Sequence, residues 1–323
     1  MKRILLSFAL LAALLGCTNC GPGKSVSSQN NNQGETTINQ PSGEKSIVYF
    51  TKDITPEALV KIYNALGRKA EGRVAVKIST GESERTHQLD PDLIGDLVKL
   101  VNGTFVECNT AYGGSRSTTE SHRKEIAKRG YERIASVDIM DEEGDMEIPV
   151  QDTKWIKYDL VGTHLQNYDF MINLAHFKGH AMGGFGGVLK NQSIGVASKR
   201  GKCYIHSTGK SLTTIMGQES QDGFLESMAA AAQGVANYFG DKILYIDIMN
   251  NMSVDCDCNA NPATPKLKDI GILASLDPVA LDKACLDLVF GHIDSDGDDA
   301  KPLQQRIKTF AVFRNINGFR ACA

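Results

Sequence analysis

The chain has 323 residues and a formal net charge of −3. Its lysines and arginines form no cluster, which argues against a nucleic-acid-binding protein. The single tryptophan and the few other aromatic residues argue against a surface that stacks on carbohydrate. The eight cysteines are irregularly spaced, which excludes a small scaffold held by disulfides.

Residues 1–16 have the pattern of a secretory signal peptide. A short basic start precedes an apolar run, from Ile4 to Leu15, that is too short to cross a membrane as a mature helix. The run ends in Leu14-Leu15-Gly16-Cys17, which resembles a bacterial lipobox and predicts Cys17 as the lipidated first residue. A standard signal-peptidase site is the alternative. We therefore expect an extracytoplasmic protein that is lipid-anchored to a bacterial membrane.

Residues 17–45 are predicted to form a flexible tether. They are rich in Ser, Asn, Gln and Gly and contain almost no large apolar residue, so they cannot bury enough surface to fold. Residues 46–323 are numerous enough for one large α/β domain or two smaller ones.

Within residues 46–323, apolar runs alternate with amphipathic stretches. Residues 141–158 are acidic and less regular, with room for short strands. The alternation indicates an α/β fold with a mostly parallel sheet and helices on both faces; two lobes around one cleft are an alternative. The predicted elements, in chain order, are strand 46–50, helix 55–66, strand 73–78, helix 90–101, strand 104–108, helix 117–129, strand 134–140, strand 170–175, helix 223–239, strand 242–248, strand 269–274, helix 277–290 and helix 301–310.

Three of these helices begin with the same local signal. Thr55-Pro56, Asp90-Pro91 and Asp277-Pro278 each place a capping side chain before a proline at the first helical position. We expect each pair to mark the start of its helix.

The predicted strand 170–175 opens into a segment rich in Gly, His and Lys. It reads His176-Phe177-Lys178-Gly179-His180, followed by Gly183-Gly184-Phe185-Gly186-Gly187-Val188-Leu189-Lys190-Asn191. A loop of this kind after a strand is how α/β proteins build sites, because glycine lets the backbone approach a ligand closely. A packed loop that binds no ligand is the alternative.

Three other polar segments also follow predicted strands. They are residues 79–82, 109–116 and 250–258. If the strands are parallel, these segments and residues 176–190 gather at one edge of the sheet. The sequence therefore predicts one shared cleft.

His176, His180 and Lys190 are candidate catalytic residues in this cleft. The two histidines are four apart and could bind one metal ion if the loop has a suitable shape, or His180 could transfer a proton. Lys190 follows Gly186 and Gly187 and is expected near a helix start, where an anion could bind.

Several residues are candidates for holding a small anionic ligand. Arg116, Lys178 and Lys202 could bind a carboxylate or phosphate, although surface solvation is the alternative for at least one cation of the cleft. Asn191 could orient a ligand or cap a turn. Gly186 and Gly187 would let the ligand approach the backbone.

Cysteine and histidine pairs suggest a metal site. Cys256 and Cys258 form a Cys-x-Cys in a polar stretch, and Cys203 and His206 are three apart. Imidazole and thiolate are ligands of zinc and iron, so these four are the candidate metal ligands. Disulfide formation is the alternative for exported cysteines. No Cys-x-x-Cys occurs, so a complete ferredoxin-type motif is absent.

The ordered motifs of residues 46–290 are similar to those of the domain-of-unknown-function 362 family. They are Val76-Lys77-Ile78 with Gly81-Glu82; Asn109-Thr110 with Tyr112, Gly114, Arg116 and His122; Lys178-Gly179-His180 with Gly184 to Gly187 and Lys190-Asn191; Cys256-Asp257-Cys258; and Gly271 to Ser275 with Asp277 to Ala280 and Asp282.

This resemblance implies additional site residues and a class of cofactor. Glu82 joins the catalytic candidates, and Lys77, Asn109 and Tyr112 join the ligand-binding ones. Some family members are described as iron–sulfur proteins, usually with an added segment rich in Cys-x-x-Cys, which this chain lacks. A more distant similarity to nickel-pincer racemases also implies His and Lys in a cleft.

We therefore expect a metal- or cofactor-dependent enzyme or redox protein that acts on a small anion. A transition metal and an iron–sulfur cluster are the candidate cofactors. A non-catalytic lipoprotein that binds a small anion or a metal is the alternative. A general base in a perturbed environment next to a reactive position would favour the enzyme, and a fully satisfied metal cage with no open ligand position would favour the binder.

Overall fold

A computed structural model describes residues 2–4 and 46–310. The predicted lipidation site Cys17 and the predicted tether lie outside the described residues, as does most of the predicted signal peptide. Among the helices that the structure describes, none combines the length and apolar composition needed to span a membrane.

The described residues form one eight-stranded sheet and two short hairpins. The order across the sheet is β1-β2-β12-β11-β8-β3-β4-β5, and β6–β7 and β9–β10 are the hairpins. The five strands from β11 to β5 are parallel, whereas β12, β2 and β1 add antiparallel pairs. The strands are β1 (Lys2–Ile4), β2 (Val48–Thr51), β3 (Val74–Lys77), β4 (Gly103–Glu107), β5 (Val137–Ile139), β6 (Asp145–Pro149), β7 (Tyr158–Gly162), β8 (Phe170–His176), β9 (Lys178–His180), β10 (Gly184–Gly186), β11 (Ile243–Met249) and β12 (Gly271–Ser275).

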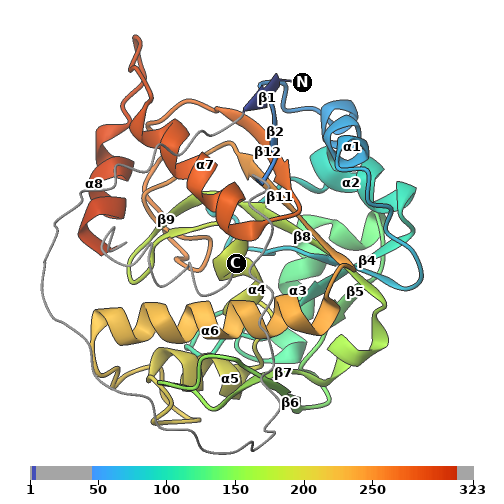
Figure 1. Cartoon of the computed structure of the whole chain (residues 1–323), viewed down its shortest axis with the longest axis vertical. Coiled ribbons are helices and arrows are strands. Elements are labelled where there is room, and N and C mark those ends of the chain that lie inside the picture. Colours follow the sequence, from blue (N-terminus) through green and yellow to red (C-terminus); the bar gives the residue numbers. More distant parts are fainter. Residues whose placement is uncertain (1, 5–45, 311–323) are drawn as a thin grey trace, which may run out of the picture. The chain divides into compact units, whose positions relative to one another are not determined.

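Helices cover both faces of the sheet (Figure 1). Helices α4, α6 and α7 pack on one face and α1, α2 and α3 on the other. The helices are α1 (Pro56–Ala65), α2 (Pro91–Leu100), α3 (Thr119–Arg129), α4 (Val188–Ser193), α5 (Lys199–His206), α6 (Gln221–Phe239), α7 (Pro278–Phe290) and α8 (Lys301–Phe310), with 3₁₀ turns η1 (Tyr131–Arg133) and η2 (Thr163–Asn167). The predicted α/β class and mostly parallel sheet are confirmed.

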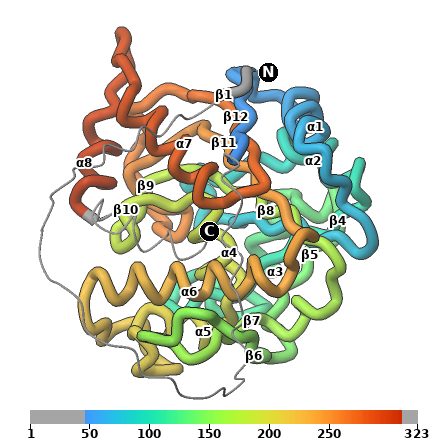
Figure 2. Tube along the Cα trace, viewed as in Figure 1, coloured from blue at the N-terminus to red at the C-terminus, as the bar shows by residue number. Residues whose placement is uncertain are grey.

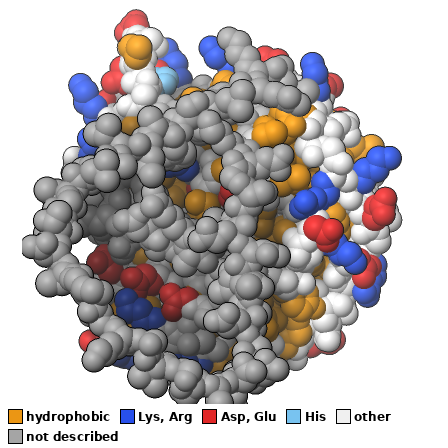
Figure 3. All heavy atoms as spheres, in the orientation of Figure 1, with side chains coloured by type: hydrophobic (Ala, Val, Ile, Leu, Met, Phe, Trp, Pro, Cys, Tyr) orange, Lys and Arg blue, Asp and Glu red, His pale blue; other side chains and the backbone are white. Residues whose placement is uncertain are grey.

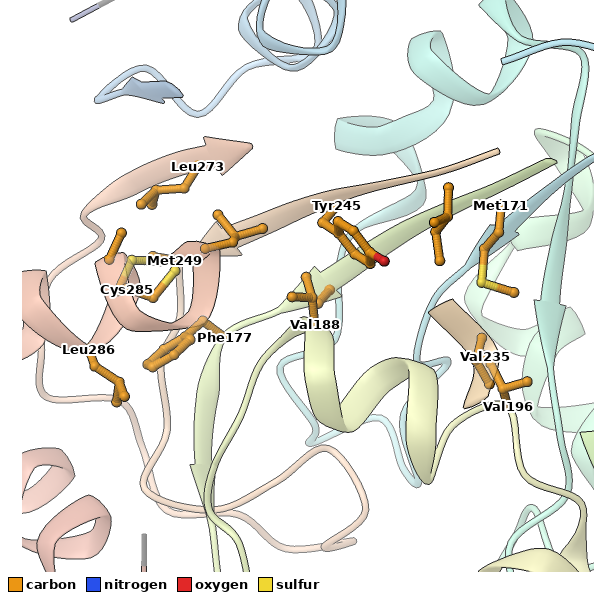
Figure 4. Close-up of a cluster of buried hydrophobic side chains, with 14 of the residues drawn as sticks. Met171, Phe177, Val188, Val196, Val235, Tyr245, Met249, Leu273, Cys285 and Leu286 are labelled. Carbon is orange, nitrogen blue, oxygen red and sulfur yellow. The ribbon is translucent and has the colours of Figure 1, made fainter. Parts of the chain in front are cut away.

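Two hydrophobic cores fill the spaces between the sheet and its helices. Successive side chains of a strand point to opposite faces, so Met171 joins the core under α4 and α7 while Ile172 joins the core under α1 and α2. Figure 4 shows the first of these cores, where Val188 at the start of α4 lies close to Tyr245 of β11. The short helix α4 is therefore fixed directly against the centre of the sheet.

A third, smaller core lies under α5 and α6. It includes Ile205 and Phe224, and it lies beside the β6–β7 hairpin. Residues 46–310 nevertheless cluster as one compact unit together with residues 2–4. The described residues therefore form one compact unit rather than two separate ones.

Surface charges are mixed in sign. Figure 3 shows basic and acidic side chains next to one another on the side of the molecule that carries α1 and α2. Exposed pairs such as Arg133–Asp92 and Arg73–Asp169, at 2.6 and 3.0 Å, contribute little individually. The stability of the fold therefore rests mainly on its cores.

The largest departure from the sequence prediction lies between β8 and α6. The first part of the predicted Gly-rich loop forms the β9–β10 hairpin, the helix start expected beside Lys190 is present as α4, and α5 was not predicted at all. The hairpin packs against α8, beside which it lies in Figure 2. The strand predicted at 269–274 is present as β12, but it runs antiparallel to β11.

Candidate functional site

A pocket opens at the carboxyl edge of the parallel strands. Its free space is about 90 Å³, several times the ~10–15 Å³ that one buried water needs, so it has room for a small ligand. Most of the site residues predicted from the sequence line it: Lys77, Tyr112, Arg116, Lys178, His180, Gly186, Gly187, Lys190, Asn191, Lys202, His206, Cys256 and Cys258. The predicted residues Glu82, Asn109, His176 and Cys203 do not.

Close packing of two segments brings the cysteine loop to the hairpin. The amide of Gly179, in β9, donates to Ser253 O at 2.8 Å. A Cβ atom at Gly179 would collide with the carbonyl oxygen of Val254. Gly179 is therefore required for close approach rather than for flexibility, and this contact places Cys256 beside His180.

His180, Cys256 and Cys258 form a cluster of potential metal ligands. One nitrogen of the imidazole and the two sulfurs lie within 4.8 Å of one another. Hydrogen bonding from Cys258, with the nearby ammonium groups of Lys190 and Lys178, holds the pKa of Cys256 well below its usual range. The Cys258 thiol, as the donor of that hydrogen bond, has a raised pKa.

The geometry around His180 fixes its tautomer. Its Nδ1 accepts hydrogen bonds from the amides of Met182 and Gly183, at 3.2 and 2.8 Å. Burial lowers the pKa of His180 well below its usual range, so the ring is neutral. The proton of the neutral ring is therefore on Nε2, which can donate a hydrogen bond and can bind a metal only after losing that proton.

His176 is buried behind the pocket and anchors the cysteine loop. Its Nδ1 lies 3.1 Å from Asp257 and its Nε2 lies 2.7 Å from Asn250 O. Lys178 Nζ lies 3.0 Å from the same carboxylate. Despite burial, Lys178 and His176 lower the pKa of Asp257. This arrangement suits a positioning role for His176 better than the catalytic role predicted for it.

Two pocket cations have no carboxylate partner among the described residues. Lys190 Nζ lies 3.7 Å from Cys256 Sγ, and Lys202 Nζ donates to Ala197 O at 2.6 Å. The other cations of the pocket are paired with Glu82, Glu107 or Asp257. Lys190 and Lys202 are thus the groups best placed to attract an anion.

Arg116 is held by two buried carboxylates. Its guanidinium lies 3.1 Å from Glu82 and 3.0 Å from Glu107, and it also donates to the Tyr112 hydroxyl. Against the effect of burial, Arg116 holds the pKa of Glu82 below its usual range. Glu82 therefore positions Arg116, and nothing in this geometry suits it to accept a catalytic proton.

Lys77 and Asn191 link the sheet to α4. Lys77 Nζ lies 3.2 Å from Asn191 Oδ1 and 3.6 Å from Glu107. Burial lowers the pKa of Lys77 to about 8. The side-chain amide of Asn191 donates hydrogen bonds through Nδ2 to Lys77 O and to Asn173 Oδ1. These contacts fix the orientation of α4 and of the pocket wall that it forms.

The start of α4 is already occupied by a carboxylate. Asp282, from α7, accepts hydrogen bonds from the amides of Val188 and Leu189 at 2.8 and 3.1 Å. Asp247 lies beside Asp282, and burial raises the pKa of both carboxyl groups. The backbone amides of Val188 and Leu189 are therefore not free to bind the expected anion, and the Lys190 ammonium remains as a candidate for that role.

Three more of the predicted residues lie outside the ligand cluster. Cys203 is buried in α5 and is not part of the cluster with Cys256 and Cys258. Asn109 bonds to Asp141 and to Thr119, at 2.8 and 2.9 Å, outside the pocket lining. His206 lines the pocket but lies outside the cluster.

Glu107 was not predicted as a site residue, and Asp282 was not predicted to have a role in the site. Glu107 ends an apolar strand, and a carboxylate at that position was a usable signal for the site. Asp282 belonged to a quoted motif, but only the folded chain brings α7 to α4.

Comparison with known proteins assigns the chain to a family. Residues 74–287 match the family described as Domain of unknown function (DUF362). The chain belongs to the DUF362 family. No functionally curated protein matches it. The DUF362 match spans β3 to α7 and so contains every strand whose carboxyl end faces the pocket.

Two solved structures are distantly similar to this DUF362 protein. A protein from Thermotoga maritima shares 14% identity at a TM-score of 0.44, over 71% of this chain and 57% of that one. The lactate racemase apoprotein from Thermoanaerobacterium thermosaccharolyticum shares 15% identity at a TM-score of 0.39, over 62% and 50%. The chain thus matches about half the length of each.

Proposed function

We propose that this protein binds a thiophilic transition-metal ion through Cys256 and Cys258 and uses it on a small anion held by Lys190 and Lys202. The observation that carries the proposal is the pair of sulfurs beside His180 in the wall of a pocket lined by cations. Thiolate is the donor that zinc, copper(I) and iron prefer.

The donor set fits a single metal ion better than an iron–sulfur cluster. Such clusters take four cysteine ligands as a rule. Three cysteines line the described pocket, and one of them, Cys108, is buried and donates to Val196 O, so only Cys256 and Cys258 lie together as donors. Cys256 and Cys258 would be the primary donors. His180 would be a third donor after release of its Nε2 proton, and otherwise a hydrogen-bond donor to a thiolate.

A centre of this kind has open positions. Structural zinc sites are closed by four protein ligands, whereas catalytic sites keep a position for water or substrate. The cluster offers at most three donors from the described residues, all at one pocket. This favours a reactive centre over the alternative of a closed, non-catalytic binder.

The chain's own residues would prepare the ligand for reaction. A bound metal ion would supply a Lewis acid or a site of electron transfer. Lys190 and Lys202 would hold the charge of the anion, and His180 Nε2 would donate to an oxygen or a thiolate. The buried walls of the pocket would strengthen these interactions by excluding water.

Metal titration of matched cysteine variants tests the proposal. Purified, reduced protein is titrated with Zn²⁺ and with Co²⁺, whose thiolate complexes absorb light. Cys256→Ser and Cys258→Ser should each weaken binding by more than the ~10–100-fold typical of an outer-shell partner. Cys203→Ser, a buried thiol outside the cluster, should bind as the unaltered protein does. Equal affinity in all three variants would refute the proposed centre.

A further inference from the structure

Helix α5 presents two side chains to the pocket, one helical turn apart. Lys202 and His206 both line it, and both are more than nine-tenths buried. The proposed metal centre uses neither as a ligand. The hydrogen-bonding state of these two side chains determines what this wall of the pocket can recognise.

His206, which lines the pocket, has one ring nitrogen that can accept a hydrogen bond. Its Nδ1 lies 2.7 Å from Lys202 O, and a carbonyl oxygen can only accept, so Nδ1 carries a proton. Burial lowers the pKa of His206 to about 4, aided by the ammonium groups of Lys190 and Lys202, so the ring is neutral. Its Nε2 is therefore an acceptor. The ring packs on Phe224, with 4.9 Å between centroids, which restricts its rotation.

Lys202 supplies charge beside this acceptor. Its ammonium donates to Ala197 O, which leaves two of its three protons available. The charge of Lys202 acts to lower the pKa of Asp159, but the two side chains form no ion pair in the described structure. A buried cation without a counter-charge is costly, so an anion bound here would relieve that cost.

The two pocket histidines thus have opposite roles. His180 presents Nε2–H as a donor, whereas His206 presents Nε2 as an acceptor. An anion without a proton would satisfy Lys202 and leave the His206 lone pair unmatched. An ammonium group could satisfy His206, but Lys190 and Lys202 would repel it. A hydroxyl carried by the anion itself satisfies both requirements.

We infer that α5 selects a small oxyanion that carries its own O–H group, with Lys202 binding the charge and His206 Nε2 accepting the hydroxyl proton. Hydrogen phosphate is the simplest member of this class. The inference rests on the proposed function in taking a small anion as the ligand of this pocket, and it names the kind of anion.

Phosphate and sulfate form a matched pair of probes. They are similar in size and shape, and at slightly alkaline pH both are mainly dianions, but only phosphate carries a proton. Calorimetric titration of the metal-free protein should show phosphate binding at least about ten-fold more tightly than sulfate, the scale of one hydrogen bond to a charged ligand. Equal affinities would overturn the inference.

Variants of α5 separate its two contributions. His206→Asn keeps a donor near Lys202 O, but the shorter side chain places no atom at the position of the His206 Nε2 acceptor, so the preference for phosphate should fall to about one. Lys202→Met should weaken both anions about ten-fold or more and leave their ratio unchanged. Lys199→Met, on the exposed part of the same helix, is the control and should change nothing. A phosphate preference that survives His206→Asn in a folded variant would also overturn the inference.

The experiment distinguishes this inference from the proposed function. Zn²⁺ is titrated into the same samples. Metal binding with equal phosphate and sulfate affinities would refute the selectivity alone. Phosphate-selective binding without metal binding would refute the metal centre and leave the α5 site standing. Absence of binding by both anions would refute the inference and the anion-holding part of the proposed function.

Discussion

Asp257 holds in place the loop that carries the two cysteines. It stands between Cys256 and Cys258, and its carboxylate lies between Lys178 and His176. The sequence suggested both cysteines as ligands but gave no role to the residue between them. Its role depends on β8 and β9, which are distant from it in the chain and adjacent only in the fold.

Asp257→Asn should destabilise the protein. The change keeps the shape of the side chain but leaves the positive charge of Lys178 buried without its counter-charge and His176 without its carboxylate partner, which costs about 3–5 kcal/mol in free energy of unfolding. Urea unfolding measures the loss. Asp255→Asn is the control, since the Asp255–Arg306 pair at 3.2 Å is partly exposed and should contribute about 1 kcal/mol or less.

The stabilisation by Asp257 should also depend on pH. The folded-state pKa of Asp257 lies below its unfolded value of about 4, so its contribution is present above that pH and is lost as the pH falls further. The difference in unfolding free energy between the unaltered protein and Asp257→Asn should stay constant from neutral pH to about pH 5, then shrink. A difference in unfolding free energy that increases as the pH falls below about 5 would contradict the lowered pKa of Asp257.

At the scale of single residues, the sequence identified the correct residue types but not their grouping. Cys203 and His206 were grouped with Cys256 and Cys258 as metal ligands because imidazole and thiolate bind the same metals. Spacing along the chain gave no indication that α5 turns His206 toward the pocket and leaves Cys203 away from the cluster. His180 was found, but its tautomer depends on two amides of its own hairpin turn.

At the scale of elements, the β9–β10 hairpin and the cysteine loop form one assembly. They meet where Gly179 contacts the backbone of Val254. The sequence suggested that the glycines serve a ligand. In the structure, this glycine serves the contact of one protein segment with another, and the site depends on that contact.

Gly179→Ala should separate these two segments. The added methyl group meets backbone atoms that cannot move without shifting the loop, so we expect a loss of about 1–3 kcal/mol in stability together with weaker Zn²⁺ binding. Gly113→Ala is the control, because no atom lies within 4 Å of a Cβ there. Differential scanning calorimetry and metal titration of both variants measure the effects. Unchanged metal affinity in Gly179→Ala would show that the contact does not position Cys256.

Local signals explain which elements were predictable. The caps Thr55, Asp90 and Asp277 are confirmed, because a capping side chain and a following proline act within one turn of the chain. Helix α4 has only six residues and is capped by Asp282 from another helix, so its own sequence carries little helical signal. The direction of β12 depends on its pairing with β2 and β11, which no local pattern encodes.

At the scale of the whole molecule, we predict that Cys17 is the lipidated N-terminus of the mature protein, which then lacks the edge strand β1 (Lys2–Ile4). Cys17→Ala should release the protein from the membrane fraction into the soluble extracytoplasmic fraction, because a tether alone has no affinity for lipid. Cell fractionation with immunoblotting measures this. A mature protein that begins at another residue and is soluble without the change would contradict the prediction.

The order of the strands in the sheet affects how the chain folds. β8 ends at His176 and its neighbour β11 begins at Ile243, so their pairing must wait for a long intervening stretch of chain to arrive. Contacts between distant segments slow folding. During that delay Cys256 and Cys258 lack the pocket walls that later enclose them, and Cys108, Cys203 and Cys285 are equally accessible partners. If the chain folds after export, as its first residues predict, the oxidising surroundings will favour wrong disulfides, and reaching the native state will require fast collapse or a reductant that repairs mispaired thiols.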